Sequence, residues 1–189
     1  MAALHVIASL LADRHGVFTR EQLRSAGVSS KRVRHALECG LWVSVLHGAF
    51  VAAAQPVGPW QRGAAAVAVT GGVVSHHSAA TLLGLALPTD TVHVTTGRTP
   101  RYVPAGVTAH HVELGGRDTC RRLGVVVTSP QRTAVDCAAA LPFGSAMDFV
   151  REAMFTEAAR RLSGSPTGIC EPQGSPDGGR TSSCVTPEG

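Results

Sequence analysis

Residues 19–51 read TREQLRSAGVSSKRVRHALECGLWVSVLHGAFV, and they contain the clearest structural signals of the chain. Thr19 and Gln22 have the spacing of a capping box, which marks the start of a helix. Gly27 stands where the chain must turn sharply, and glycine tolerates the positive φ that such turns need. The stretch therefore begins with a short helix followed by a tight turn.

A second helix follows the turn. Ser29 or Ser30 can cap its start, and Gly40 suits the position just past its end. Its apolar residues recur at the spacing of one helix face, and its basic residues lie on the outer face. The apolar set is Val33, Ala36 and Leu37; the basic set is Lys31, Arg34 and His35, with Arg32 at the flank. Two capped helices, the second of them basic, predict a helix-turn-helix that binds duplex DNA.

A β-hairpin comes next, with strands over residues 42–46 and 49–51 around His47-Gly48. This is the place of the wing in a winged helix-turn-helix. Residues 4–14 have helical periodicity and are expected to support the motif.

Charge agrees with a nucleic-acid partner. Residues 1–55 contain six Lys/Arg against three Asp/Glu, whereas the whole chain of 189 residues has a formal net charge of +4. Positive charge is thus densest in the segment that would contact phosphates. A solvated basic helix face remains the alternative interpretation.

Compartment and redox state are inferred from absences in the sequence. The five cysteines have no zinc-ligand spacing, and their use fits a reducing cytosol. Cys39 and Cys137 are expected to be small buried hydrophobes. The N-terminus does not resemble a signal peptide, and no apolar run reaches the ~18 residues of a membrane span. We expect a soluble cytoplasmic protein without metal or cofactor.

The fold class predicted for the chain is α+β, in three parts. A winged helix-turn-helix takes residues 1–55, a small α/β domain takes 56–162, and residues 163–189 form a disordered tail rich in Gly, Pro and Ser. In the second part, helices are expected at 60–69, 78–84, 130–140 and 145–162, and strands at 73–76, 91–96, 107–114 and 124–128. Ser78 and Ser129 are expected to cap the second and third of these helices.

Four segments in this order resemble the AbiEi antitoxins of type IV toxin–antitoxin systems, in their actinobacterial form. They are GVFTREQLRSAGVSSKRVRHAL (16–37), LWVSVLHGAFV (41–51), VVSHHSAATLLGL (73–85) and VVVTSPQRTAVDCAA (125–139). The resemblance implies a winged helix-turn-helix that binds its own promoter, and a second domain that counteracts a nucleotidyltransferase-like toxin. The wing usually has a basic residue where this chain has Ser44. Many relatives continue into a nuclease-like domain where this chain has its tail, so no nuclease activity is transferred.

The resemblance also indicates which residues contact DNA. It places Ser30, Lys31, Arg32, Arg34 and His35 on the recognition helix and His47 at the wing tip. With the neighbouring Thr19, Arg20 and Ser29, these are the predicted DNA-binding residues. Two alternatives stay open: a protein-interaction module that uses its winged helix against a protein partner, and a truncated remnant of a nuclease-fused relative.

The sequence gives less support to an enzymatic function. Ser75 and His76, with Asp136 downstream, could be imagined as a triad, but no Gly-x-Ser-x-Gly elbow surrounds Ser75. Adjacent histidines on a strand point to opposite faces. A metal site would therefore need His93 with one member each of His76-His77 and His110-His111. We expect no enzyme and no metal.

Two further basic features have competing interpretations. The helix start at 129–133 could hold an anion beside Arg132, but capping by Ser129 and an ion pair from Arg132 to Asp136 explain it better. The loop GRTPRYVP (97–104) carries Arg98 and Arg101, which could touch DNA or a protein partner or be simply exposed.

Overall fold

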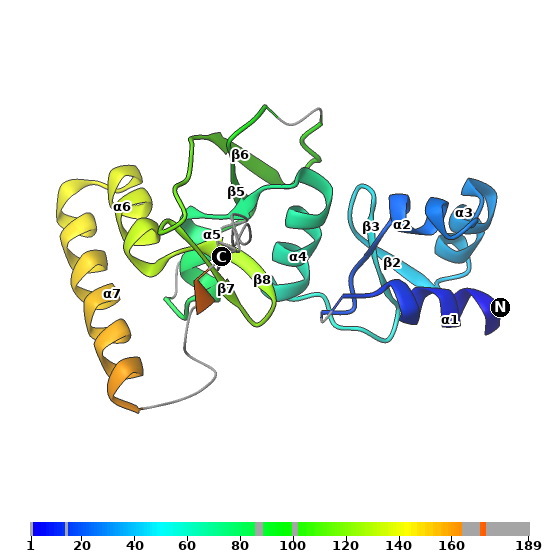
Figure 1. Ribbon diagram of the computed structural model, residues 1–189, viewed down its shortest axis with the longest axis horizontal. Helices are drawn as coiled ribbons and strands as arrows, with labels where there is room; N and C mark the ends of the chain where they lie inside the picture. Colours follow the sequence, from blue (N-terminus) through cyan, green and yellow to red (C-terminus); the bar gives the residue numbers. More distant parts are fainter. Residues whose placement is uncertain (1, 14, 86–88, 100–101, 164–170, 173–189) are drawn as a thin grey trace, which may run out of the picture.

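A computed structural model describes residues 2–13, 15–85, 89–99, 102–163 and 171–172 (Figure 1). The fold is α+β, as the sequence predicts. The N-terminal helices lie at one end of the long axis, two sheets and a central helix follow, and a helical hairpin forms the other end (Figure 1).

Three helices form the N-terminal end: α1 (Ala2–Leu11), α2 (Arg20–Ser25) and α3 (Ser30–Glu38). The capping box is confirmed, because the Gln22 N–H donates to Thr19 Oγ1 (3.2 Å) and the Thr19 N–H donates to Gln22 Oε1 (2.7 Å). Ser29, rather than Ser30, caps α3. Gly27 has a φ of +78°, as the turn requires.

A three-stranded antiparallel sheet packs under these helices. Its strands are β1 (Phe18–Thr19), β2 (Trp42–Leu46) and β3 (Ala49–Ala52), in the order β1-β3-β2. The hairpin was predicted; β1 was not, because two residues are too few to show alternation. One face of the sheet presents Phe18, Trp42 and Phe50 to a buried cluster with Leu23 and Val33 of the helices.

The opposite face of this sheet is covered by α4 (Pro59–Thr70). Leu46, Ala49 and Val51 lie in one buried cluster with Ala65 and Ala66 of that helix. Figure 1 shows α4 standing between the two sheets. The hairpin is therefore a middle layer and not a projection into solvent on both sides.

The second sheet has six strands in the order β6-β5-β4-β8-β7-β9. They are β4 (Val73–Val74), β5 (Val92–Thr96), β6 (Val107–His111), β7 (Thr119–Arg122), β8 (Val125–Thr128) and β9 (Glu171–Pro172). Pairing is mixed, since β5–β6 and β4–β8 are parallel and the other pairs are antiparallel. Val74, Val94 and Val127 fill its core against α4.

Three more helices accompany this sheet: α5 (His76–Leu82), α6 (Pro130–Ala140) and α7 (Phe143–Ser163). Ala80, Cys137 and Phe149 form a separate buried cluster that joins them. Ser129 caps α6 with Pro130 at its first position, as predicted.

Two of the expected side-chain roles are wrong. Ser78 does not cap α5, because the chain leaves β4 at Ser75 and the helix starts directly at His76. The Ser78 hydroxyl instead ties α5 to the sheet by accepting from the His93 N–H (2.9 Å). Cys39 is exposed, since it ends α3 on the solvent side, whereas Cys137 is buried as expected.

The third part of the chain differs in one place from the expectation of a disordered tail. Glu171–Pro172 pairs with β7 as the edge strand β9. An unpaired sheet edge accepts any extended segment without apolar periodicity, and proline is tolerated at such an edge. Residues 164–170 and 173–189 lie outside the described part.

Cys120 of β7 is disulfide-bonded and not a free thiol.

Candidate nucleic-acid interface

The outer face of α3 is exposed and basic. Val33 and Ala36 are buried beneath the helix, and Lys31, Arg32, Arg34 and His35 face solvent. A groove of about 330 Å³ lies beside this face, lined by Arg20, Ser30, Lys31, Arg34 and Leu37. Three cations from two helices therefore border one hollow on the surface.

Arg20 connects this groove with the hairpin. It is the first residue of α2, and its backbone N–H donates to the Gly48 carbonyl in the hairpin turn (2.8 Å). Its guanidinium lies over the Phe50 ring, 5.5 Å from the centroid, within the range of a cation–π contact. The start of α2 is thus fixed against the hairpin by both backbone and side chain.

The acidic residues near these cations do not prevent them from binding a phosphate. Arg34 and Glu38 form a long ion pair of 3.9 Å on the exposed surface of α3. Exposed pairs of this kind are worth about 0–1 kcal/mol, so a phosphate can replace the carboxylate. Within the described residues, neither Lys31 nor Arg32 takes part in an ion pair.

The remaining predicted contact residues have mixed surroundings. The hydroxyl groups of Thr19 and Ser29 cap helices by accepting hydrogen bonds from backbone N–H groups. The His35 ring lies 3.6 Å from the sulfur of Cys39 on the same helix. His47, in the hairpin turn, makes an edge-on contact with Tyr102, which lies between β5 and β6, with 5.7 Å between ring centroids. No sequence signal pointed to this last contact.

Comparison with known protein families finds a match over the same segment. Residues 5–53 match a family model described as transcriptional regulator, AbiEi antitoxin. Over these residues the chain is similar to AbiEi antitoxin transcriptional regulators. The match begins within α1, includes α2, α3 and the hairpin, and ends before α4. No curated protein matches the chain. Within the described residues, no helix is both long enough and apolar enough to cross a membrane.

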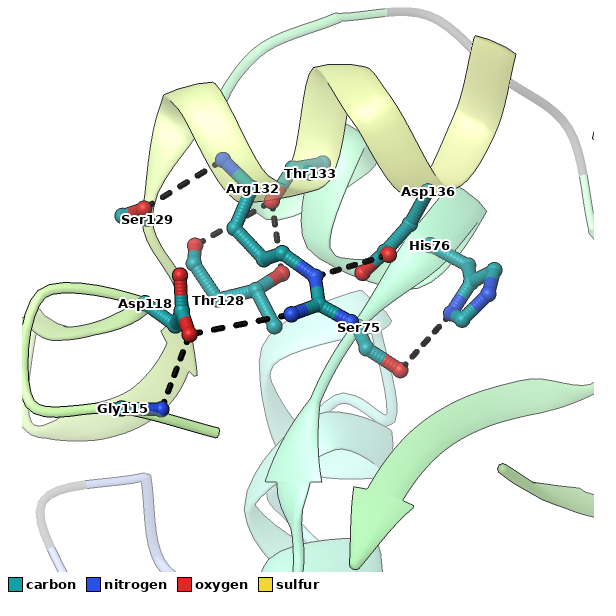
Figure 2. Close-up of polar contacts among 9 residues, drawn as sticks. All are labelled: Ser75, His76, Gly115, Asp118, Thr128, Ser129, Arg132, Thr133 and Asp136. Atoms are coloured by element: carbon teal, nitrogen blue, oxygen red, sulfur yellow. Dashed lines mark hydrogen bonds and ion pairs between the residues drawn. The ribbon is translucent and has the colours of Figure 1, made fainter. Parts of the chain in front are cut away.

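Beyond the matched residues, a polar network surrounds Arg132 of α6 (Figure 2). Its Nε donates to Asp136 Oδ1 (2.8 Å), and its Nη1 lies 3.7 Å from Asp118 Oδ2. Asp118 Oδ2 also accepts from the Gly115 N–H, and the Ser129 hydroxyl caps α6. The predicted ion pair to Asp136 is confirmed, and Asp118 is an additional partner that the sequence did not reveal. Arg132 thereby holds the loop of Asp118 to α6.

The imagined triad is present only in part. The Ser75 hydroxyl lies 3.0 Å from Nδ1 of His76. Figure 2 shows that the Asp136 side chain lies on the side of α6 that faces Ser75 and His76. Ser75 is completely buried, however, so a substrate cannot reach its oxygen. Burial, reinforced by the charge of Asp136, raises the pKa of the Cys137 thiol to about 12, so this neighbour stays a protonated thiol.

Four histidines gather beside the triad residues. His76 and His77 lie on α5 and not on a strand, so the expectation that they point to opposite faces of a sheet is wrong. His93 Nδ1 and His110 Nε2 are 3.0 Å apart, and the His76 ring stacks on the His110 ring. Stacked rings direct their nitrogen lone pairs in parallel planes instead of toward one point. Accordingly, the described residues contain no group of three His, Cys, Asp or Glu that could hold a metal ion.

Proposed function

We propose that this protein is a DNA-binding transcriptional regulator of the antitoxin type, which binds the promoter of its own operon. The observation that carries the proposal is the exposed basic face of α3 beside the groove bordered by Arg20, Lys31 and Arg34. A capped helix of this kind, joined to a preceding helix by a tight turn, enters the major groove with its N-terminal residues on base edges.

The long cations have distinct roles in this proposal. Lys31 and Arg34 reach base edges, since long cations are the commonest side chains that read guanine. Arg20 and Arg32 neutralise phosphates on either side. Thr19 and Ser29 cap α2 and α3 and so fix the two helix starts that carry these cations. Ser30, His35 and His47 complete the predicted contact set.

The second domain is proposed to counteract a nucleotidyltransferase-like toxin without a stable complex between the two proteins. This part of the proposal rests on the resemblance of the segments at 73–85 and 125–139 to AbiEi antitoxins. A toxin reading frame next to this gene is the expected genomic neighbour, and its absence would count against the antitoxin role.

The test is a gel-shift titration with the duplex upstream of the gene. Replacing both Lys31 and Arg34 by alanine is expected to weaken binding by about 1–3 kcal/mol per base-contacting side chain. Arg151→Ala is the matched control, because Arg151 is an exposed arginine on α7, at the other end of the molecule (Figure 1). Equal affinity of the double variant and the control would remove α3 as the recognition helix.

Salt dependence separates DNA binding from a protein-interaction module. Neutralising several phosphates makes log K fall linearly with log salt concentration, by about 0.9 per phosphate contacted. A wild-type protein that binds neither the promoter duplex nor a scrambled duplex at low salt would favour the protein-partner alternative.

A further inference from the structure

A cavity of about 600 Å³ lies between the start of α4, helix α5 and the start of β5. Its lining residues fall within 57–63, 78–82 and 89–92, together with Val74 of β4. Binding sites for small molecules have volumes of about 300–1,000 Å³ and mostly apolar walls with a few polar groups. The cavity therefore has the size of a small-molecule site, and it shares no lining residue with the groove beside α3.

The walls of the cavity are aliphatic. Val57 and Pro59 line it at the start of α4, Leu82 lines it from α5, and Val74 and Val92 line it from the sheet. None of the described residues that line it is aromatic. The cavity therefore offers no flat ring on which a nucleobase could stack, and its walls suit an aliphatic body instead.

Two side chains of opposite charge line this cavity without pairing. Arg62 belongs to α4 and Asp90 directly precedes Thr91 at the start of β5, and both side chains are exposed. In the part of the chain that the structure describes, neither of them takes part in an ion pair. A guanidinium matches a carboxylate with two parallel hydrogen bonds, and a carboxylate accepts from an ammonium group. The cavity thus presents one anchor for each sign of charge.

Hydrogen bonds hold the chain on both sides of Asp90. The Thr91 carbonyl accepts from the hydroxyl groups of Thr89 (2.7 Å) and Ser78 (3.4 Å). The Thr91 hydroxyl lies 3.0 Å from the hydroxyl of Thr108 on β6. These lining hydroxyl groups are engaged within the fold, so the two charged side chains are the strongest anchors left for a ligand.

We propose that this cavity binds a small zwitterionic molecule with an aliphatic body, of the class of amino acids and short peptides. Arg62 binds the carboxylate, Asp90 accepts hydrogen bonds from the ammonium group, and Val74, Leu82 and Val92 contact the aliphatic part. The inference goes beyond the proposed function, because none of these residues belongs to the predicted DNA-binding set.

The test measures binding of L-leucyl-L-leucine to the full chain by isothermal titration calorimetry. Two analogues each lack one charge: the C-terminal amide has no carboxylate, and the N-acetylated dipeptide has no ammonium group. We expect the zwitterion to bind about tenfold more tightly than either analogue, because each analogue loses one charge-assisted contact.

Two variants assign the anchors. Arg62→Gln should abolish the preference for the free dipeptide over its amide and keep the preference over the N-acetylated form. Asp90→Asn should do the reverse. Arg151→Gln and Asp148→Asn are the matched controls, because they neutralise exposed charges on α7, and both should bind all three compounds as the wild type does. Unchanged thermal midpoints establish that the variants are folded.

Three results would overturn the inference: no saturable binding of the dipeptide, equal affinity for the three compounds, or a variant that retains the preference assigned to its residue. None of these measurements contains DNA. The outcome is therefore independent of the gel-shift titration, and the proposed function can stand while this inference fails.

Discussion

The imidazole rings of His76 and His110 stack with their centroids 3.7 Å apart and their planes 14° from parallel. They come from α5 and β6, which are far apart in the sequence, and His93 of β5 lies beside both. Two stacked imidazolium cations at this separation would repel each other strongly. The contact therefore disfavours a positive charge on both rings at once.

The first prediction concerns acid stability. Burial, followed by repulsion from His110, lowers the pKa of His76 from 6.5 to about 4, and the nearby Asp136 only partly opposes this. Burial also lowers the pKa values of His93 and His110. Between pH 6.5 and about 4 the unfolded chain binds more protons at His76 than the folded chain does. The contribution of His76 to the free energy of unfolding is therefore fully present above this pH window, and it is lost as the pH decreases through the window.

His76→Asn tests this prediction. Asparagine does not titrate, and it tolerates the positive φ of 49° found at this position. We expect the thermal midpoint of the variant to fall less steeply between neutral pH and pH 4 than that of the wild type. His35→Asn, which removes an exposed histidine from α3, should keep the wild-type slope. Parallel pH profiles for all three proteins would show that the stack does not control acid stability.

The second prediction concerns the clamp around Arg132. Asp136 has only 9% of its side chain exposed, and its Oδ2 has no hydrogen-bond partner among the described residues. Removing the guanidinium would leave both carboxylate oxygens unpaired in a buried place. We expect Arg132→Ala to lower the free energy of unfolding by about 2–3 kcal/mol, measured by urea denaturation.

The matched control is the exposed pair between Arg151 and Asp148, whose side chains are 66% and 78% exposed. Arg151→Ala should change the free energy of unfolding by at most about 0.5 kcal/mol. Combining Arg132→Ala with Asp136→Ala should cost less than the sum of the two single changes, because the buried charge is removed together with its partner. Additive costs would show that the two residues stabilise the fold separately.

The parts of the fold that could be predicted are those with local signals. The capping box at Thr19, the turn at Gly27 and the cap at Ser29 each depend on residues within four positions of one another. The hairpin has alternation over two strands with a glycine between them. Such patterns arise from backbone geometry and leave the same trace wherever the segment packs.

The parts that could not be predicted depend on distant pairs. β1 and β9 have two residues each and exist only through their partner strands. The contact of His47 with Tyr102 joins residues that are 55 positions apart, and nothing in either segment indicates the other. Asp118 became a partner of Arg132 in the same way. Such pairs follow from how the layers stack and leave no periodic trace in the sequence.

The last prediction concerns the division into residues 1–55 and 56–162. Val51 of the hairpin is completely buried in the same cluster as Ala65 and Ala66 of α4. If this cluster joins the two parts into one cooperative unit, weakening it from the hairpin side must also weaken α4. Val51→Ala removes two buried methyl groups and is expected to cost about 2 kcal/mol.

Native-state hydrogen exchange measures where this loss appears. We expect the amides of α4 to lose the same free energy of opening as the amides of β3. Val33→Ala is the matched control, because it removes the same two methyl groups from the helical cluster on the other face of the sheet. It should lower the protection of α2 and α3 more than that of α4. If Val51→Ala leaves the protection of α4 unchanged, the hairpin opens independently of α4, and the boundary between residues 55 and 56 separates two units of stability.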